Sequence, residues 1–390
     1  MFFKKMLDTS NLLNLLSQHN HSSQNTLMWL RMWKLWGKIT PQFLAFSSLE
    51  KTLQYAEKSP KLSQSVLSVE EAQKLYDEAK SFGAEVLTPT HPTYPQSLLE
   101  INDFPLVLYA YGNLELFKKP KVAIVGSRSA SAEAMQISYN FAKELSQAGF
   151  AIVSGFANGI DTSACKGALE HGSIQVLGSG LKVPYPHTNI SLFHDVIKKG
   201  GLFLSEFPIL FPAKPANFPI RNRIITGLSL GVLIGQANRR NGVSGTLVTL
   251  RIAINQGKEI FAYPGSILDE RHTICNNLIK NGTAYFTTSS EDIITALNSH
   301  HKKNTNTQQI LEKFEEIIEK PSLFTQKKEE VFDAQLNPVY GTISTSPISI
   351  NDISSITNLS SSIVQQTLIE LELEGKIVVD ALGRYTRSLV

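Results

Sequence analysis

Six short apolar runs follow one another through the middle of the chain: VAIVG, FAIVSG, IQVLG, LFLSEF, GVLIGQ and EIFAYPG. Each is rich in β-branched or aromatic residues and is bounded by turn residues, a pattern typical of strands buried on both faces of a sheet. Between the first two runs, Ile137, Phe141 and Leu145 repeat at helical spacing, and Gly149 is placed to end the helix. Strand and helix alternate to about Leu297. The pattern predicts an α/β fold with a Rossmann-like, doubly wound and mostly parallel sheet.

The N-terminal part of the chain has a helical pattern instead. Trp29, Trp33 and Trp36 recur at i, i+4 and i+7, which predicts one face of a helix between Met28 and Phe46. Core packing in a small helical domain is the favoured interpretation of these tryptophans, and base stacking is the alternative.

These shifts of pattern divide the chain into five parts. We expect a leader of about 25 residues and a small helical domain, of the SAM or helix–hairpin–helix type, over residues 1–66. Residues 67–117 form a lead-in segment of the central domain, and residues 118–299 form the Rossmann-like domain. A polar linker that includes HHKKNTNTQQ follows over 300–335, and a winged-helix domain occupies 336–390.

The winged-helix prediction rests on two helices followed by a short hairpin. The supporting residues are Val364, Leu368 and Leu371 on one face of the second helix, Ser362 and Gln365 as a capping box, Gly375 as a C-cap, and IVVD with the Gly383 turn as the wing. The second helix also carries Glu370, Glu372 and Glu374 but no Lys or Arg, which argues against its insertion into a major groove. Protein contact, or duplex binding through Arg384 and Arg387 of the wing, is favoured.

Composition changes this picture little. The 390 residues are 42% hydrophobic and 18% charged, as expected for a folded chain of two to four domains. The net charge of +3 does not by itself indicate a nucleic-acid binder, so a DNA-binding surface would have to be local. Cys165 and Cys275 belong to no CxxC pair, and no run of about 18 apolar residues occurs, so we expect a cytoplasmic protein with no membrane contact.

Three loops at predicted strand ends carry the candidate ligand chemistry. The first strand ends in Gly126-Ser127-Arg128 before a helix, where backbone N–H groups and a permanent charge would meet an anion. The GxGxxG fingerprint is absent there, which disfavours NAD or FAD, and no cofactor is expected. The second strand leads into a loop that contains Gly155, Phe156 and Gly159, whose glycines permit close approach of a phosphate or sugar; Asp161 could simply cap the next helix. The loop after GVLIGQ contains Ser244, Gly245 and Thr246 before another helix.

The stretch KPANFPIRNRIITGLS is the most informative. Its candidate contacts are Lys214, Asn217, Phe218, Arg221 and Arg223. Guanidinium groups at a helix N-terminus suit a polyanion, and an aromatic ring beside them gives a base a surface on which to stack, so the combination favours a single strand over a free nucleotide. Surface arginines paired with carboxylates are the alternative interpretation.

Nothing in the sequence indicates catalysis. His171, His187 and His194 have no metal-ligand spacing, and Asp161, Asp195 and Glu206 lack an evident catalytic partner. We therefore expect neither a metal site nor an enzyme.

Several motifs in register resemble the DNA-processing protein A family (DprA, also called Smf): VAIVGSR, SGFANGID, VLGSGL with VPYP, SEFP, NFPIRNRIITGLS, and YPGS with CNNLIKNGTAYF. The resemblance runs from about Tyr94 to Leu297 and extends to the C-terminal winged helix. The chain departs from the usual pattern at Asn158, Cys165 and Gln236, where arginine, histidine and an acidic residue are more common, and at GVSGT, which replaces a basic-Ser-Gly motif.

The resemblance implies a bacterial protein of natural transformation and recombination that binds and protects incoming single-stranded DNA and loads the recombinase RecA on it. It implies RecA and a second copy of the chain as partners, with single-stranded DNA-binding protein as a further candidate. The implied DNA contacts are Ser127, Arg128, Gly155, Gly159, Asn217, Phe218, Arg221 and Arg223, with Lys214 as a weaker transfer.

Two rival functions remain. A nucleotide phosphoribohydrolase of the lysine-decarboxylase-like group shares the fold, and Ser244-Gly245-Thr246 resembles part of its loop, but Thr249 stands where its catalytic glutamate is expected. A nucleotide-sensing transcription regulator with a winged helix is the second rival, and the acidic second helix argues against it.

Overall fold

The computed structural model describes residues 22–35, 48–237 and 245–299, and in the C-terminal part 310, 311, 314, 338–344, 346–361, 363, 364, 367, 368, 371, 377–380 and 384–387. The chain divides into two compact units, Met1–Ile318 and Glu319–Val390. Each unit is described by itself below. Among these residues, no helix has the length and apolar character that crossing a bilayer requires.

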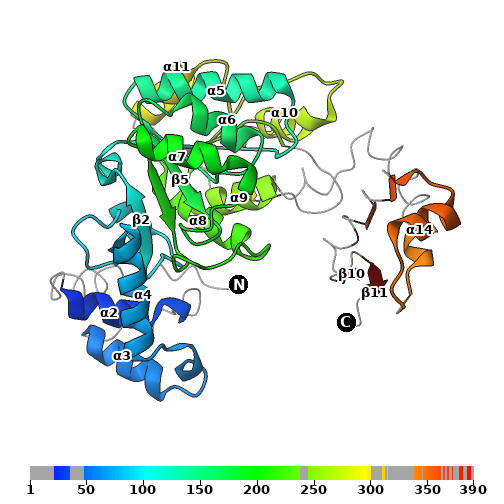
Figure 1. Ribbon diagram of the computed structural model, residues 1–390. Coiled ribbons are helices and arrows are strands. Elements are labelled where there is room, and N and C mark those ends of the chain that lie inside the picture. The colour runs from blue at the N-terminus through cyan, green and yellow to red at the C-terminus, as the bar shows by residue number, and fades with distance from the viewer. Residues whose placement is uncertain are drawn as a thin grey trace. The chain divides into compact units, whose positions relative to one another are not determined.

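A mixed sheet forms the centre of the first unit (Figure 1). The nine strands described are β1 Glu85–Leu87, β2 Leu108–Gly112, β3 Lys121–Val125, β4 Ala151–Ser154, β5 Ser173–Leu177, β6 Leu202–Ser205, β7 Gly231–Ile234, β8 Glu259–Ala262 and β9 Tyr285–Phe286. Their order is β1-β2-β6-β5-β4-β3-β7-β8-β9. The strands from β3 to β9 are parallel to one another, whereas β2 is antiparallel to β6 and β1 to β2. The predicted fold class is confirmed.

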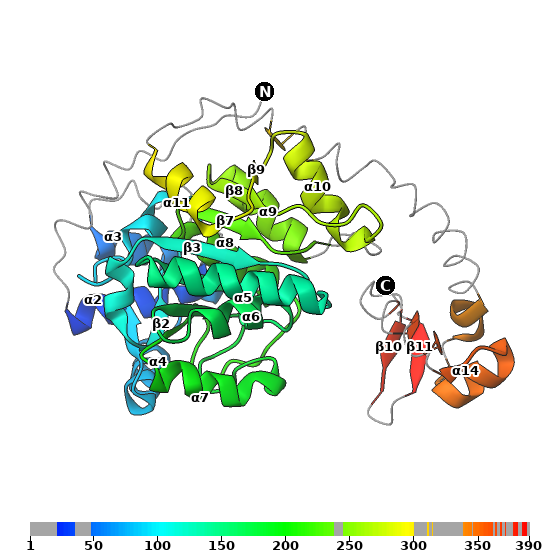
Figure 2. The same cartoon turned by 90° about the horizontal axis from the view of Figure 1, so that it is seen from above.

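Helices cover both faces of this sheet (Figure 2). They are α5 Ala132–Gln147, α6 Ile160–Gly167, α7 Ile190–Lys198, α8 Asn217–Leu228, α9 Gly245–Asn255, α10 Thr273–Lys280 and α11 Ser290–Asn298. Alternate residues of β3 separate the two layers: Val122 and Ile124 belong to a buried cluster with α5, α6 and α11, and Ala123 and Val125 to the cluster that contains α8 and α9. Helix α5 follows β3 on one face of the sheet, and α9 follows the neighbouring strand β7 on the other face. The strand order therefore reverses between β3 and β7. A crevice for ligands is expected at the carboxyl ends of strands at such a point.

The N-terminal helices pack onto the same core. They are α2 Ser23–Arg31, α3 Leu49–Lys58 and α4 Val69–Phe82. The Trp29 indole donates to the Thr90 hydroxyl at 3.2 Å, and the Trp33 ring meets the edge of Phe211 at 6.1 Å between centroids. Both tryptophans are buried, which confirms the core interpretation. The single helix predicted from Met28 to Phe46 is wrong, because α2 ends at Arg31 and a 3₁₀ turn follows; Trp36 lies outside the described residues.

The lead-in segment contains two strands that the sequence pattern did not reveal. Both β1 and β2 belong to the central sheet, and β2 continues it through Tyr109, which pairs with Ser205 of β6. Helix α4 precedes them, with a Ser68–Glu71 capping box at its start and Gly83 at φ +84° after its end. Short 3₁₀ helices occur at Trp33–Leu35, Ser63–Ser65, Gln96–Glu100, Leu114–Lys118, His187–Asn189 and Glu270–His272.

The second unit has its own small core. Its described elements are α14 Ile350–Thr357, β10 Ile377–Val379 and β11 Tyr385–Arg387. Val364, Leu368 and Leu371 are buried together with Ile353, as the predicted helix face requires. The predicted capping box, the C-cap Gly375 and the three glutamates lie outside the described residues. Of the wing arginines, Arg384 forms an ion pair with Asp380 at 2.8 Å, and Arg387 donates to the carbonyls of Ile343 and Tyr340.

Candidate nucleic-acid interface

The carboxyl ends of β3, β4 and β5 bring three glycine-containing loops to one edge of the sheet. The loops begin at Gly126, Gly155 and Gly178, and the first residues of α8 lie against them. We call this surface the carboxyl edge, comprising residues 126–131, 155–159, 178–189 and 214–218.

The loop after β3 is fixed to the end of β7. The Ser127 backbone N–H donates to the Gln236 carbonyl at 2.7 Å, and the Ser131 N–H donates to the Gln236 side-chain oxygen at 2.9 Å. The Ser131 hydroxyl then accepts the Ala134 N–H and caps the 16-residue helix α5. These bonds leave the Arg128 side chain exposed beside the positive end of a long helix.

The loop after β4 interlocks with the first. Gly159 has φ +78°, and a β-carbon there would collide with the backbone oxygens of Ser127 and Arg128. The Ile160 N–H also donates to the Ser127 carbonyl, at 3.3 Å. A glycine is therefore required at this position both by the backbone conformation and by the closeness of the neighbouring loop.

Two buried groups of opposite charge, Asp161 and Arg221, lie beneath the two loops. Asp161 accepts the Gly155 N–H at 3.0 Å, and Arg221 donates to the carbonyls of Gly155, at 2.7 Å, and Val176. Burial raises the pKa of Asp161, against the opposing effect of Arg221, and burial lowers the pKa of Arg221 to about 10. Arg221 is only 4% exposed. Asp161 thus supports the glycine loop instead of serving only as a helix cap, and Arg221 joins the ends of two strands.

The Phe218 ring contacts two arginine side chains and the loop after β5. Its ring lies over the backbone of Gly178, and the guanidinium carbons of Arg128 and Arg221 lie 5.6 and 5.8 Å from the ring centroid. Asn217, at the start of α8, donates to the Gly178 carbonyl at 3.0 Å and so fixes the helix to the loop after β5. The structure therefore brings Arg128 to a partly exposed aromatic ring, whereas the sequence had predicted that ring beside Arg221 and Arg223.

Arg223 lies away from the carboxyl edge and is buried, so the prediction that it contacts phosphate needs correction. Its guanidinium donates to Glu206 at 2.6 Å and to the Asp103 carbonyl at 2.8 Å, and the residue is 4% exposed. Two residues after Arg221 on a helix, it points to another side of α8. The alternative interpretation, an arginine paired with carboxylates, describes Arg223.

Several other predicted positions also need correction or qualification. The Phe156 side chain is fully buried and meets the edge of Phe203 at 5.1 Å, so only its backbone belongs to the loop. Gly245 and Thr246 open α9, whereas Ser244 lies outside the described residues. Lys214 is exposed, and its ammonium group lies 5.4 Å from the centroid of Phe211.

Sequence reasoning overlooked an aromatic side chain at this edge. Tyr185, in the loop after β5, is 41% exposed, and its ring centroid lies 5.5 Å from that of Phe218. His187 meets the Tyr185 ring edge-on at 6.1 Å. The VPYP motif could have indicated this residue, but only the contact with Phe218 shows that it belongs to the edge.

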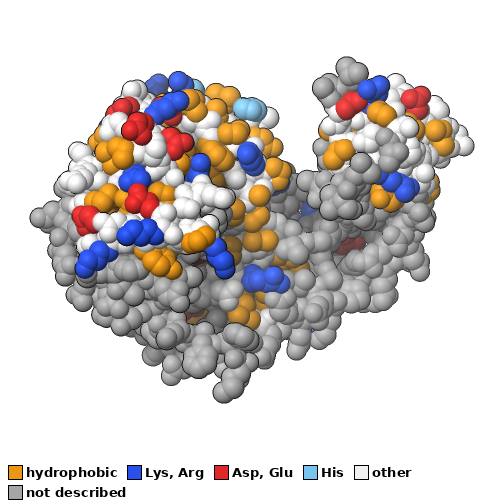
Figure 3. All heavy atoms as spheres, turned by 90° about the horizontal axis from the view of Figure 1, so that it is seen from below, with side chains coloured by type: hydrophobic (Ala, Val, Ile, Leu, Met, Phe, Trp, Pro, Cys, Tyr) orange, Lys and Arg blue, Asp and Glu red, His pale blue; other side chains and the backbone are white. Residues whose placement is uncertain are grey.

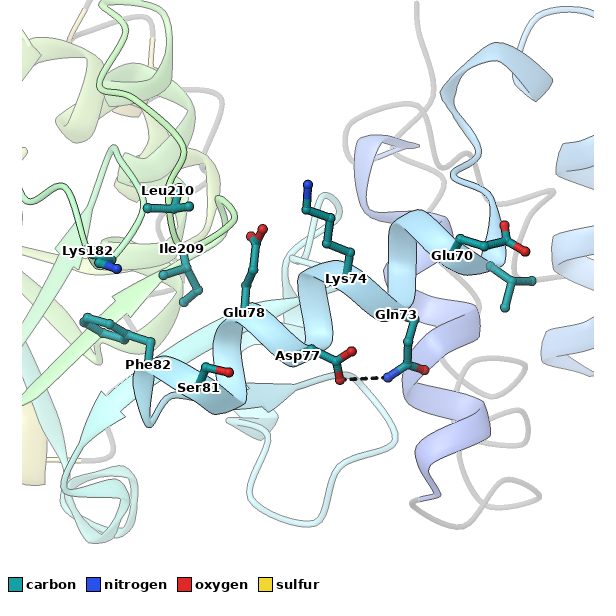
Figure 4. A pocket seen from close by; sticks show the side chains of 11 residues that line it. Glu70, Gln73, Lys74, Asp77, Glu78, Ser81, Phe82, Lys182, Ile209 and Leu210 are labelled. Atoms are coloured by element: carbon teal, nitrogen blue, oxygen red, sulfur yellow. Dashed lines mark hydrogen bonds between the residues drawn. The ribbon is translucent and has the colours of Figure 1, made fainter.

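Two other surfaces of the described residues differ from the carboxyl edge. On the face shown in Figure 3, basic and acidic side chains of the described residues are interspersed. A hollow of about 840 Å³ lies between α4 and the 209–210 loop, and Glu70, Lys74 and Asp77 are among its lining residues (Figure 4). It contains none of the predicted contacts. Among the described residues, no group of three His, Cys, Asp or Glu side chains could hold a metal ion.

The fold and its carboxyl edge define a class of protein: a doubly wound α/β protein whose strand-end loops combine glycines, an exposed arginine and aromatic rings. Residues 85–298 match the family DNA recombination-mediator protein A, and residues 325–381 match the DprA winged helix domain. The chain belongs to the DNA recombination-mediator protein A family, the family of the DNA processing proteins DprA and Smf.

Sequence similarity to curated relatives supports this assignment, and the chain is also similar to two solved structures. The chain is 44% identical over 204 residues to DNA processing protein DprA of Streptococcus pneumoniae, covering 52% of this chain and 70% of the relative. It is 41% identical over 203 residues to protein Smf of Escherichia coli, covering 52% of this chain and 53% of the relative. The crystal structure of the S. pneumoniae protein aligns with 77% of this chain and 100% of its own length, at a TM-score of 0.55 and 29% identity. A structure of DNA processing protein A from Helicobacter pylori, which concerns that protein's binding of single-stranded DNA, covers 55% of this chain and 95% of its own length, at 31% identity and a TM-score of 0.49.

Proposed function

We propose that this protein binds single-stranded DNA along the carboxyl edge. The observation that carries the proposal is the contact between Arg128 and Phe218, which places an exposed guanidinium group 5.6 Å from an aromatic ring beside the N-terminus of α5. An arginine and helix N–H groups suit a phosphate, and a partly exposed ring suits a base. Lys214 extends the cationic surface along the approach to α8.

The site residues have different roles in this proposal. Arg128 and Lys214 contact phosphates, Phe218 stacks on a base, and the backbones of Gly126, Ser127, Gly155 and Gly159 allow the strand to approach. Asn217, Arg221 and Asp161 are positioning residues that hold these loops. Arg223 stabilises the interior through Glu206.

The biological role that we propose follows from the family. The protein would protect incoming single-stranded DNA and load RecA on it during transformation and recombination, as a cytoplasmic homodimer without catalytic turnover. Contact with single-stranded DNA-binding protein belongs to the same proposal. Family membership supports this role, and the binding surface supplies its first requirement, a hold on the DNA backbone.

The first prediction concerns Arg128. We expect short oligo-dT to bind with an affinity that falls steeply with salt, because phosphate contacts release counterions. Arg128→Ala should weaken binding by about 1–3 kcal/mol, the loss expected for a charged contact. Fluorescence anisotropy over a salt titration, with oligo-dT, duplex DNA and AMP as ligands, measures both effects.

Lys118→Ala is the matched control, since Lys118 is an exposed cation that precedes β3 at the opposite edge of the sheet. It should leave oligo-dT binding unchanged. The proposal fails if AMP binds as well as oligo-dT, or if Arg128→Ala and Lys118→Ala behave alike.

A further inference from the structure

Tyr185 and Phe218 form two aromatic faces of different orientation. Their ring centroids lie 5.5 Å apart, and the ring planes are inclined by 55°. Tyr185 is 41% exposed and Phe218 is partly exposed, so each retains surface that solvent can reach. Arg128 lies on the Phe218 side of the pair.

The loop that carries Tyr185 is anchored at both ends. After it, the Asn189 amide donates to the Phe156 carbonyl at 3.0 Å and to the Thr162 hydroxyl at 2.9 Å. Before it, the backbone N–H groups of Gly180 and Lys182 donate to the carbonyls of Phe211 and Ile209. A side chain on an anchored loop loses little conformational freedom when a ligand binds, so its contact is worth more.

We propose that Tyr185 is a second base-stacking residue, which binds the base next to the one on Phe218. The inference rests on the proposed function and extends it to the choice between single and double strands. Neighbouring bases of a duplex are nearly parallel, whereas these two rings are inclined by 55°. Only a strand whose backbone can rotate between bases places one base on each ring, and single strands have that freedom.

His187 supports the orientation of this second face. Its ring meets Tyr185 edge-on, at 6.1 Å and an interplanar angle of 75°. The contact holds one edge of the tyrosine ring and leaves a face available. His187 therefore acts as a positioning residue for Tyr185.

The test is a double-mutant cycle between the protein and the oligonucleotide. We expect Tyr185→Leu to weaken oligo-dT binding about tenfold, in line with the stacking of one base, and Tyr185→Phe to bind like the unchanged protein. An abasic site moved stepwise along the oligo-dT should reveal one position at which Tyr185→Leu has no further effect. Residual duplex binding should be the same for all these proteins. The ratio of oligo-dT affinity to duplex affinity should therefore fall in Tyr185→Leu.

Tyr55→Leu is the matched control, because Tyr55 is 42% exposed but lies on α3. Circular dichroism melting checks that the variants fold. If Arg128→Ala weakens binding and Tyr185→Leu does not, the second stacking site is overturned and the proposed function stands. An equal loss for Tyr185→Leu at every abasic position also overturns it. If the unchanged protein does not bind oligo-dT, both proposals are overturned.

Discussion

Arg221 and Arg223 are two residues apart and have different partners. Arg221 donates to the carbonyls of Gly155 and Val176 beneath the carboxyl edge, and Arg223 pairs with Glu206 away from it. Neither guanidinium group is more than 4% exposed. Their common role is to satisfy buried acceptors, and the phosphate contacts depend on the exposed cations Arg128 and Lys214.

A prediction follows for Arg223. Arg223→Met should lower the free energy of unfolding by about 3–5 kcal/mol, because it leaves the Glu206 carboxylate buried without its partner. Urea denaturation measures the loss. The double variant with Arg223→Met and Glu206→Leu should regain much of the stability, because no charge is then left buried without a partner. This folded double variant should bind oligo-dT normally. Weak DNA binding by that folded variant would show that Arg223 contacts the ligand.

The sequence could predict the chemistry of these residues but not their partners. Arg128 lies three residues after the end of a buried strand, so its position at the edge could be inferred from local pattern alone. Glu206 and Asp103 come from segments 17 and 120 residues away from Arg223, and only the folded chain brings them together. Tyr185 was overlooked for the same reason, since its neighbour Phe218 belongs to another element.

At the scale of elements, the six apolar runs predicted strands correctly, and the edge strands β1 and β9 were not predicted. Strands β3 to β8 correspond to the six runs because burial on both faces leaves an unmistakable apolar segment. The described lengths of β1 and β9 are three and two residues, too short for a periodic pattern. Strand β2 was not predicted because it follows a segment with several prolines, which was interpreted as extended chain. Its pairing with β6 could not be predicted either, because the two strands lie far apart in the sequence.

The interlocking of two loops gives a prediction at this scale. Gly159→Ala should cost stability through its positive φ and should also displace the Ser127–Arg128 backbone, so oligo-dT binding should fall by at least tenfold. Gly149→Ala is the matched control, because Gly149 also has a positive φ, +95°, but nothing lies within 4 Å of the position that its β-carbon would take.

Gly149→Ala should lose about 1–2 kcal/mol of unfolding free energy from backbone strain. Gly159→Ala should lose more, because its β-carbon also meets the Ser127 carbonyl oxygen, and only Gly159→Ala should also lose DNA affinity. Thermal melting and anisotropy measured on the same samples separate the two effects. Normal affinity in a folded Gly159→Ala protein would mean that the loop contact does not position Arg128.

At the scale of the whole molecule, the two units have separate cores. A chain that ends at Ile318 keeps the first unit intact and should bind oligo-dT within about twofold of the full chain, if the carboxyl edge supplies the contacts that hold the strand. Anisotropy with both proteins measures this. A large loss in a truncated chain that melts normally would place part of the binding surface in the C-terminal unit.

The antiparallel pairing of β2 with β6 has a consequence for how the protein is made. Tyr109 leaves the ribosome roughly a hundred residues before Ser205, its partner, so at ~5–20 residues per second β2 waits many seconds for its neighbour. During that time the edge of β2 that will face β6 is open to pairing with other nascent chains, whereas β1 can already pair with the opposite edge. The hydrogen bond from Trp29 to Thr90 and the packing of α4 against β1 involve only residues that are synthesised before β2, so both can form before β6 exists.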